Sequence, residues 1–181
     1  GCISLQKIEI PSSVLFIGDS AFEGCVSLAD ISISSPLQSI EEKTFARCSS
    51  IVNFNIPDSV KIIRKNAFKC CTSLFSIKIP QKVEVIEDWT FSGCSNLTNV
   101  SIPDSVTSIE RSAFRDCTSI VSITIPKSTR YIGKSAFHGC SMLKKINILS
   151  DDISIGRNAF IRCSSHLQIN VPLSLQSKLK I

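Results

Sequence analysis

The stretch of residues 97–117, LTNVSIPDSVTSIERSAFRDC, decides the fold because its apolar pattern recurs along the chain. The Phe-x-x-Cys pair near its end occurs seven times at intervals of 23 residues, from Phe22/Cys25 to Phe160/Cys163. Cys2 lies one interval earlier. A fixed period of this length is typical of solenoids, in which each repeat is one turn stacked on the next. The sequence therefore predicts a solenoid.

The Leu-x-x-Ile-x-Ile part of each repeat alternates apolar and polar residues, which indicates a half-buried strand. A proline usually follows, and it ends the strand because it has no N–H for the ladder. The Val-x-x-Ile part is expected to cross the opposite side as a second short strand. Ala-Phe-x-x-Cys is too short for a regular helix and predicts a single 3₁₀ or α turn. The residues expected to point inward are Ile8/Ile10, Ile31/Ile33, Phe54/Ile56, Ile77/Ile79, Val100/Ile102, Ile123/Ile125, Ile146/Ile148 and Ile169/Val171.

These motifs resemble the BspA-like leucine-rich repeats, whose pattern is Leu-x-x-Ile-x-Ile-Pro-x-x-Val-x-x-Ile-x-x-x-Ala-Phe-x-x-Cys. The resemblance runs from Cys2 to about Val171. It implies a leucine-rich-repeat solenoid, a β-rich curved right-handed superhelix with a parallel sheet, short 3₁₀/α turns and a C-terminal helical cap. Many family members are surface proteins of bacteria and parasitic protists that attach to host proteins or other cells. Three positions depart from the pattern: Ser34 and Leu149 replace prolines, and His166 replaces a leucine.

Residues 1–181 are expected to form one domain of about eight repeats that starts within a repeat. The opening at Gly1-Cys2 indicates a piece of a longer protein, and end-to-end self-association of an uncapped N-terminal end is a second interpretation. Residues 172–181 break the repeat and predict a C-terminal cap, in which Leu173, Leu175 and Leu179 with Lys178 and Lys180 form a short amphipathic helix. No apolar run is long enough to span a membrane.

Eight of the nine cysteines occupy equivalent positions, so their side chains are expected to point the same way. Parallel side chains one strand spacing apart are poor disulfide geometry, which favours a ladder of reduced thiols that donate to turn carbonyls. Disulfides remain the alternative for a secreted chain. Cys70 lies outside the ladder, and we expect it to be the exposed, most reactive thiol.

No catalytic, cofactor-binding or metal-binding residue is predicted. His138 and His166 have no partners at catalytic or metal-ligand spacing, and no two cysteines form a Cys-x₂₋₄-Cys pair. The repeat already gives the cysteines a structural role. Acidic pairs such as Glu41-Glu42 and Asp151-Asp152 are interpreted as solvated surface.

The outward residues of the strand segments form the predicted partner-binding surface, which is rich in short polar side chains. Its candidate contact residues are Asn53, Asn55, Ser76, Lys78, Asn99, Ser101, Ser122, Thr124, Lys145 and Asn147. A solvated face with no partner is the alternative, because strong interface residues are usually Trp, Tyr or Arg. Two apolar rows offer a rival patch: Val52, Phe75 and Val121, and Phe16, Ile62, Val85 and Tyr131 with Trp89 nearby.

Charge divides the chain into two parts. Residues 1–116 carry eleven Lys/Arg and thirteen Asp/Glu, whereas residues 117–181 carry nine and two. The basic part favours an acidic glycan, acidic protein or anionic lipid headgroup, and no nucleic acid is expected because no aromatic stacking set accompanies the charges. Asn96 and Asn99 begin glycosylation sequons that matter only in a secreted eukaryotic protein.

Together these features predict a non-enzymatic protein- or glycan-binding module of a cell-surface or secreted protein, used in adhesion or partner recognition. Two alternatives remain. The first is an intracellular interaction scaffold, which reduced cysteines would suit. The second is a targeting module for an enzyme domain outside this sequence.

Overall fold

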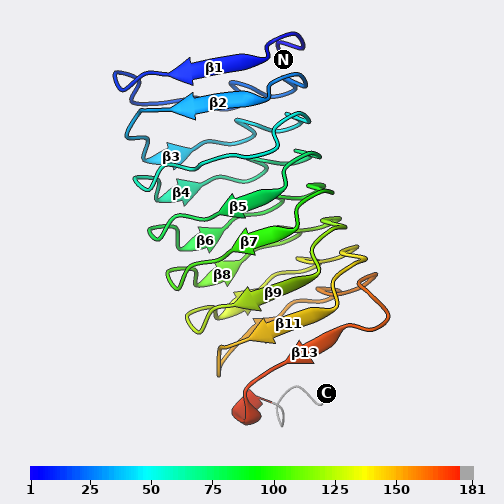
Figure 1. Ribbon diagram of the computed structural model, residues 1–181. Coiled ribbons are helices and arrows are strands. Elements are labelled where there is room, and N and C mark those ends of the chain that lie inside the picture. The colour runs from blue at the N-terminus through cyan, green and yellow to red at the C-terminus, as the bar shows by residue number, and fades with distance from the viewer. Residues whose placement is uncertain (176–181) are drawn as a thin grey trace.

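The computed structural model describes residues 1–175 and shows a solenoid of parallel β-strands with almost no helix, which confirms the predicted leucine-rich-repeat fold. A regular coil contains a front strand, a turn, a short back strand and a second turn (Figure 1); the first coil has no back strand, and the coil at Asn53 has no front strand. The N-terminus and the end of the described chain lie at opposite ends of the stack. The front strands form the front sheet and the back strands form the back sheet, and we call the turn that carries the Phe-x-x-Cys segment the turn side.

The front strands pair in parallel with a register of one repeat, so that Ile8 pairs with Ile31 and Ile123 with Ile146. Equivalent side chains of successive coils are therefore neighbours. The front strands are β1 (Lys7–Ile10), β2 (Asp30–Ile33), β5 (Ser76–Lys78), β7 (Asn99–Ser101), β9 (Ser122–Ile125), β11 (Lys145–Ile148) and β13 (Gln168–Asn170).

The back strands are two residues long, and their second residue is the isoleucine of the Val-x-x-Ile motif. This confirms the predicted second strand on the opposite side of the coil. The back strands are β3 (Ser39–Ile40), β4 (Ile62–Ile63), β6 (Val85–Ile86), β8 (Ser108–Ile109), β10 (Tyr131–Ile132) and β12 (Ser154–Ile155).

Neither sheet is continuous. The front strands form three sheets, β1–β2, β5–β7 and β9–β11–β13, and the back strands form β3–β4 and β6–β8–β10–β12. Between β2 and β5 the coil at Asn53 keeps only a single bridge to Ser76. Phe54 replaces an isoleucine there, and its ring packs against Phe45 and Phe68 with centroids 4.7 and 5.0 Å apart. The break between β7 and β9 falls among regular repeats.

The turn side differs from the predicted 3₁₀ or α turn. In the first coil, Ala21, Glu23 and Cys25 donate to the third residue before them, whereas Ser20, Phe22 and Gly24 donate to the next coil. The chain therefore alternates local turns with ladder bonds and cannot continue as a helix. Ser20 and Gly24 have positive φ, which suits the third residue of a type II turn.

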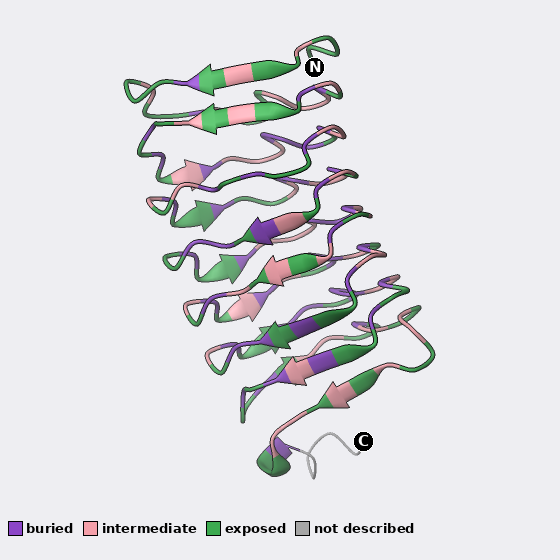
Figure 2. Cartoon of the chain, viewed as in Figure 1, coloured by how far each residue is buried: buried purple, intermediate pink, exposed green. Residues whose placement is uncertain are grey.

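The core is one continuous column of apolar side chains between the three parts of the coil. Within it, rings of successive coils stack with centroids 5.3–5.8 Å apart, from Phe22 to Phe160. The five central rings, Phe45 to Phe137, are fully buried, whereas Phe22 and Phe160 in the end coils are only partly buried. Figure 2 shows how buried, intermediate and exposed residues follow one another along the coils. A ring in the column contacts an identical ring on each side, which fixes the stacking register.

At the C-terminal end, Leu173–Leu175 are helical, and Leu175 is buried against the core. Leu173 is exposed. Lys178, Leu179 and Lys180 of the predicted cap lie outside the described residues, so the cap stays a prediction. Within the described chain, no helix is long and apolar enough to cross a membrane.

Candidate functional site: the outer face of the front sheet

The ten candidate contact residues lie on or beside the front strands, in rows that follow the stacking direction. Eight of them are exposed, and Ser76 and Asn147 are half-buried. The side chains between them, such as Ile77 and Ile123, point into the core. Strand alternation therefore places the predicted residues together on one surface, as the sequence pattern indicated.

A groove of about 590 Å³ lies in the middle of this surface, over β5, β7 and β9. Six of the ten candidate residues line it: Ser76, Lys78, Asn99, Ser101, Ser122 and Thr124. Asn53, Asn55, Lys145 and Asn147 lie outside it. Asn147 borders a second hollow of about 400 Å³ at the carboxyl ends of β9, β11 and β13. The surface is thus hollowed at its centre.

Side chains at the ends of the face pair with each other, whereas in the groove only Asn99 and Thr98 do so among residues 1–175, the Asn99 amide donating to the Thr98 hydroxyl at 3.1 Å. Lys7 and Asp30 form an ion pair at 2.9 Å, and the Asn170 amide donates to the Asn147 side-chain oxygen at 2.8 Å. Within residues 1–175, the side chains of Ser101, Ser122 and Thr124 have no hydrogen-bond partner in the protein. Their hydroxyls are therefore available to a ligand.

The predicted rival patch of apolar residues partly borders the same groove. Phe75 and Val121 precede groove residues in sequence and are 48% and 44% exposed. Thr98 is the equivalent residue of the coil between them and lines the groove, where its hydroxyl donates to the Phe75 carbonyl at 3.1 Å. Thr98 was not among the predicted contact residues, because its row, with Phe75 and Val121, was interpreted as an apolar patch separate from the polar face. The structure brings the two together.

The thiols form the expected ladder along the turn side. Cys71, Cys94, Cys117 and Cys140 each donate to the carbonyl of the phenylalanine 26 residues earlier, at 3.1–3.2 Å. Burial raises the pKa of the Cys48 thiol to about 12 and that of Cys163 to about 11. These thiols stay protonated and act as donors, so the ladder has a packing role and no nucleophilic one.

Cys70 is half-buried, so the expectation of an exposed thiol is wrong. It has positive φ and lies beneath Gly93 of the next coil, where an added Cβ would come within 3.0 Å of the Cys70 sulfur. Stacking therefore covers a position that looked free in the sequence. Cys2, at the end of the stack, is exposed.

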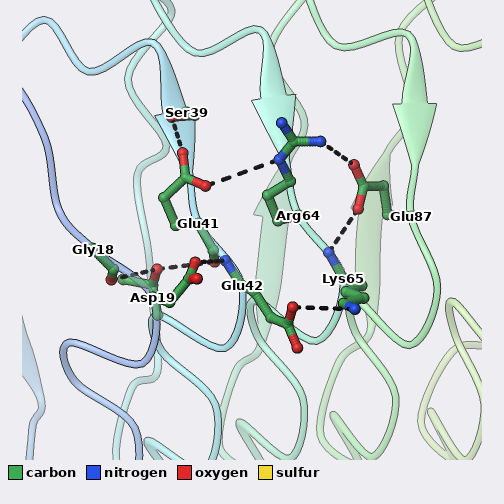
Figure 3. Close-up of polar contacts among 9 residues, drawn as sticks. Gly18, Asp19, Ser39, Glu41, Glu42, Arg64, Lys65 and Glu87 are labelled. Atoms are coloured by element: carbon green, nitrogen blue, oxygen red, sulfur yellow. Dashed lines mark hydrogen bonds and ion pairs between the residues drawn. The ribbon is translucent and has the colours of Figure 1, made fainter.

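A ridge of charged residues follows the back strands and joins successive coils. Arg64 lies between Glu87, at 3.3 Å, and Glu41, at 3.9 Å (Figure 3). Glu87 also accepts the backbone N–H of Lys65 at 2.9 Å. Because β4 and β6 belong to different sheets, the two contacts of Glu87 link coils that lack ladder bonds at the back sheet, whereas Glu41 contacts Arg64 between the paired strands β3 and β4. Their position indicates a structural role.

The carboxylates of this ridge bind its own cations. Burial opposes ionisation of Glu42, but hydrogen bonds from Lys65 and Lys43 outweigh it and lower the pKa of the carboxyl group. Further along, Gly133 and Gly156 take the positions of Glu87 and Arg64, beside the exposed Lys134 and Arg157. The excess of positive charge in residues 117–181 therefore appears along the ridge that follows the back strands. Among residues 1–175, no group of three or more His, Cys, Asp and Glu side chains could hold a metal ion.

Comparison with known proteins agrees with this geometry. The sequence matches the family described as "BspA type Leucine rich repeat region" in six copies, over residues 1–117 and 61–179. No curated protein sequence matches. The chain belongs to the BspA-type leucine-rich-repeat family.

The solved structures that are similar to the chain include two leucine-rich-repeat proteins of bacteria. A T. pallidum leucine-rich-repeat protein is 30% identical, with a TM-score of 0.86, and the alignment covers 97% of this chain and 82% of that one. A leucine-rich cell-surface protein from Faecalibacterium prausnitzii is 27% identical, with a TM-score of 0.74. That alignment covers 92% of this chain and 61% of the other, so this chain spans less than two thirds of that relative.

Proposed function

We propose that the chain is a non-enzymatic binding module of a cell-surface or secreted protein, used in adhesion or partner recognition. The observation that carries the proposal is the groove on the front face, where the hydroxyls of Ser101, Ser122 and Thr124 have no partner within residues 1–175 and where the exposed Phe75 and Val121 directly precede lining residues in sequence. Exposed apolar residues beside a polar, hollowed surface are typical of protein-binding sites. The similarity to a cell-surface protein supports the location.

The ligand is a protein or a glycan, and the basic excess of residues 117–181 favours an acidic one. A repeat surface suits a partner that contacts several coils, because many modest contacts then add up. Of the two ligand classes, the apolar border of the groove favours a protein.

Binding to purified extracellular-matrix proteins and to a glycan array tests the proposal. The double variant Asn99→Arg/Thr124→Arg changes the groove, and Gln81→Arg/Thr107→Arg adds the same charge outside it. We expect saturable binding that only the groove variant weakens, by at least about tenfold, or about 1.4 kcal/mol. Absence of saturable binding to either ligand class, with tight binding to a cytosolic protein, would refute it.

An intracellular interaction scaffold is the second candidate. The nine free cysteines favour it, because disulfides persist in oxidising compartments and reduced thiols are usual in the cytosol. A signal peptide in the full-length gene product would exclude this candidate. Its absence, together with a cytosolic location of the tagged full-length protein, would favour it.

A further inference from the structure

The groove lies where the front sheet opens. Strands β7 and β9 occupy consecutive coils, yet β7 pairs only with β5 and β9 only with β11. Within the described residues, no backbone hydrogen bond joins residues 98–102 to residues 121–125. Figure 1 shows a wider separation between β7 and β9 than between β9 and β11. We call this break the seam.

The same two coils are bonded everywhere else. On the back sheet, β8 pairs with β10 in register, and Gly133 donates to the Ile109 carbonyl at 2.7 Å. On the turn side, Phe114 donates to the Ala136 carbonyl at 2.8 Å, and the rings of Phe114 and Phe137 stack at 5.3 Å. The coils are thus held on two sides and separate only at the front, which makes the seam local.

Burial shows the consequence of the separation. Ile77 and Ile123 are each 3% exposed, whereas Val100, the equivalent residue of β7, is only half-buried. Ile102 is half-buried as well, although Ile79 and Ile125 are buried. Figure 2 shows this difference at the centres of β5, β7 and β9. The seam therefore has an apolar floor.

The edges of the seam carry backbone groups that no ladder satisfies. Ser101 accepts a bond from the β5 side, and Val121 and Ile125 accept bonds from the β11 side. Because bonds of a parallel strand alternate between its two neighbours, the N–H and C=O groups of Val100, Ser122 and Thr124 face the seam. Exposed strand edges of this kind pair readily with another chain.

We propose that the seam binds an extended polypeptide segment of the partner protein, with apolar side chains at alternate positions. Peptide backbone is the ligand that presents donors and acceptors at ladder spacing, which the edges of β7 and β9 require. Alternate side chains of such a segment point to one face and reach Val100 and Ile102, while the others face solvent. The inference rests on the proposed function, because it names the partner's binding element at the same groove.

The probe is a set of linear 12-residue peptides selected from a phage-displayed library against the protein and then synthesised. Ser101→Arg fills the groove, and Ser32→Arg makes the same change at the equivalent exposed position of β2, away from the groove. We expect Ser101→Arg to weaken peptide binding at least tenfold and Ser32→Arg to change it less than twofold. Thermal unfolding of both variants checks that they fold.

Two further readouts separate backbone pairing from side-chain contact. Bound peptide should slow amide exchange at Val100, Ser122 and Thr124, and N-methylation of every second peptide residue should abolish binding. Failure to select any peptide, protection elsewhere, or equal binding of the N-methylated peptide would overturn the inference. If matrix proteins or glycans still bind and Asn99→Arg/Thr124→Arg weakens them, the proposed function stands and only the extended segment is wrong.

Discussion

On the turn side, each coil is attached to the next by a stacked phenylalanine ring, backbone bonds and, in most coils, a donated thiol. On the front face, the same coils form three separate sheets and meet only through strand ladders and strand side chains. The turn side stays continuous past the seam and the front sheet does not. Attachment by several kinds of contact therefore preserves the register of the coils on the turn side, and the front face, with fewer kinds of contact, is where we propose that a partner binds.

The largest effect is expected at the centre of the phenylalanine column. Phe91 is fully buried between Phe68 and Phe114, at 5.5 and 5.4 Å between centroids. Phe91→Ala should lower the free energy of unfolding by about 3–5 kcal/mol because it leaves a cavity. Phe75→Ala, on the exposed border of the groove, should cost less than about 1 kcal/mol. Urea denaturation measures both, and similar costs would contradict the contrast between the two sides.

Alkaline pH should lower the free energy of unfolding through the buried thiols of the turn side. Burial raises the pKa of the Cys71, Cys94 and Cys117 thiols well above their ordinary value. These thiols stay protonated in the folded chain and ionise in the unfolded chain, so the stability they provide is complete below about pH 8.5 and is lost as pH rises toward the folded values. At pH 10, about 1.5 units above the ordinary thiol pKa, each fully buried thiol should cost roughly 2 kcal/mol.

The urea midpoint measured from pH 7.5 to pH 10 checks this dependence. It should be constant up to about pH 8.5 and fall above it. Cys94→Ala/Cys117→Ala should fall less steeply, because two of the ionising thiols are gone. A midpoint that does not change up to pH 10 would show that the thiols are not buried as described.

A single rung of the ladder should matter less than a ring. Cys94 is buried and donates to the Phe68 carbonyl at 3.2 Å. Cys94→Ala should cost about 1–3 kcal/mol through the lost donor and the space left by the sulfur. Cys70→Ala, at the half-buried neighbour of the ladder, should stay within about 0.5 kcal/mol. Thermal unfolding compares the stability of the two variants. A larger loss of stability in Cys70→Ala than in Cys94→Ala would show that the thiol ladder does not stabilise the fold.

The smallest expected effect is a gain. Arg47 has a φ of 62°, and Gly24, Gly93 and Gly139 occupy its equivalent position with positive φ. Arg47→Gly should raise stability by about 0.5–1 kcal/mol, because glycine adopts this conformation without strain. Lys61→Gly, at an exposed position without positive φ, should lower stability by about the same amount. Calorimetry measures both shifts, and a loss at Arg47 would contradict the turn geometry.

The 23-residue repeat predicted most of the fold because it determines which residues of successive coils stack. It does not determine the local backbone conformation. The strands, the inward residues and the thiol ladder follow from the 23-residue spacing, since equivalent residues must stack. The turn conformation did not follow, because positive φ at Ser20 and Lys43 comes from bonding to the next coil. Cys70 was misplaced for a related reason, since Gly93 of the next coil covers it.

The candidate face was predictable from strand alternation, but its groove was not. Val100 obeys the same inward pattern as Ile77 and Ile123, so no residue type in the sequence indicates that β7 and β9 separate. The seam is a property of how the coils stack. Phe54 is different, because a large ring at an isoleucine position does indicate a disturbed strand.

Amide hydrogen exchange of the free protein tests most directly the claim that the coils are closed on the turn side and open at the front. We predict that the amides of Val100, Ser122 and Thr124 exchange about 100-fold faster than those of Phe91 and Phe114, which donate to the next coil at 2.8 Å. Equal protection of the two sets would mean that β7 and β9 are paired, and the account of the groove would be wrong.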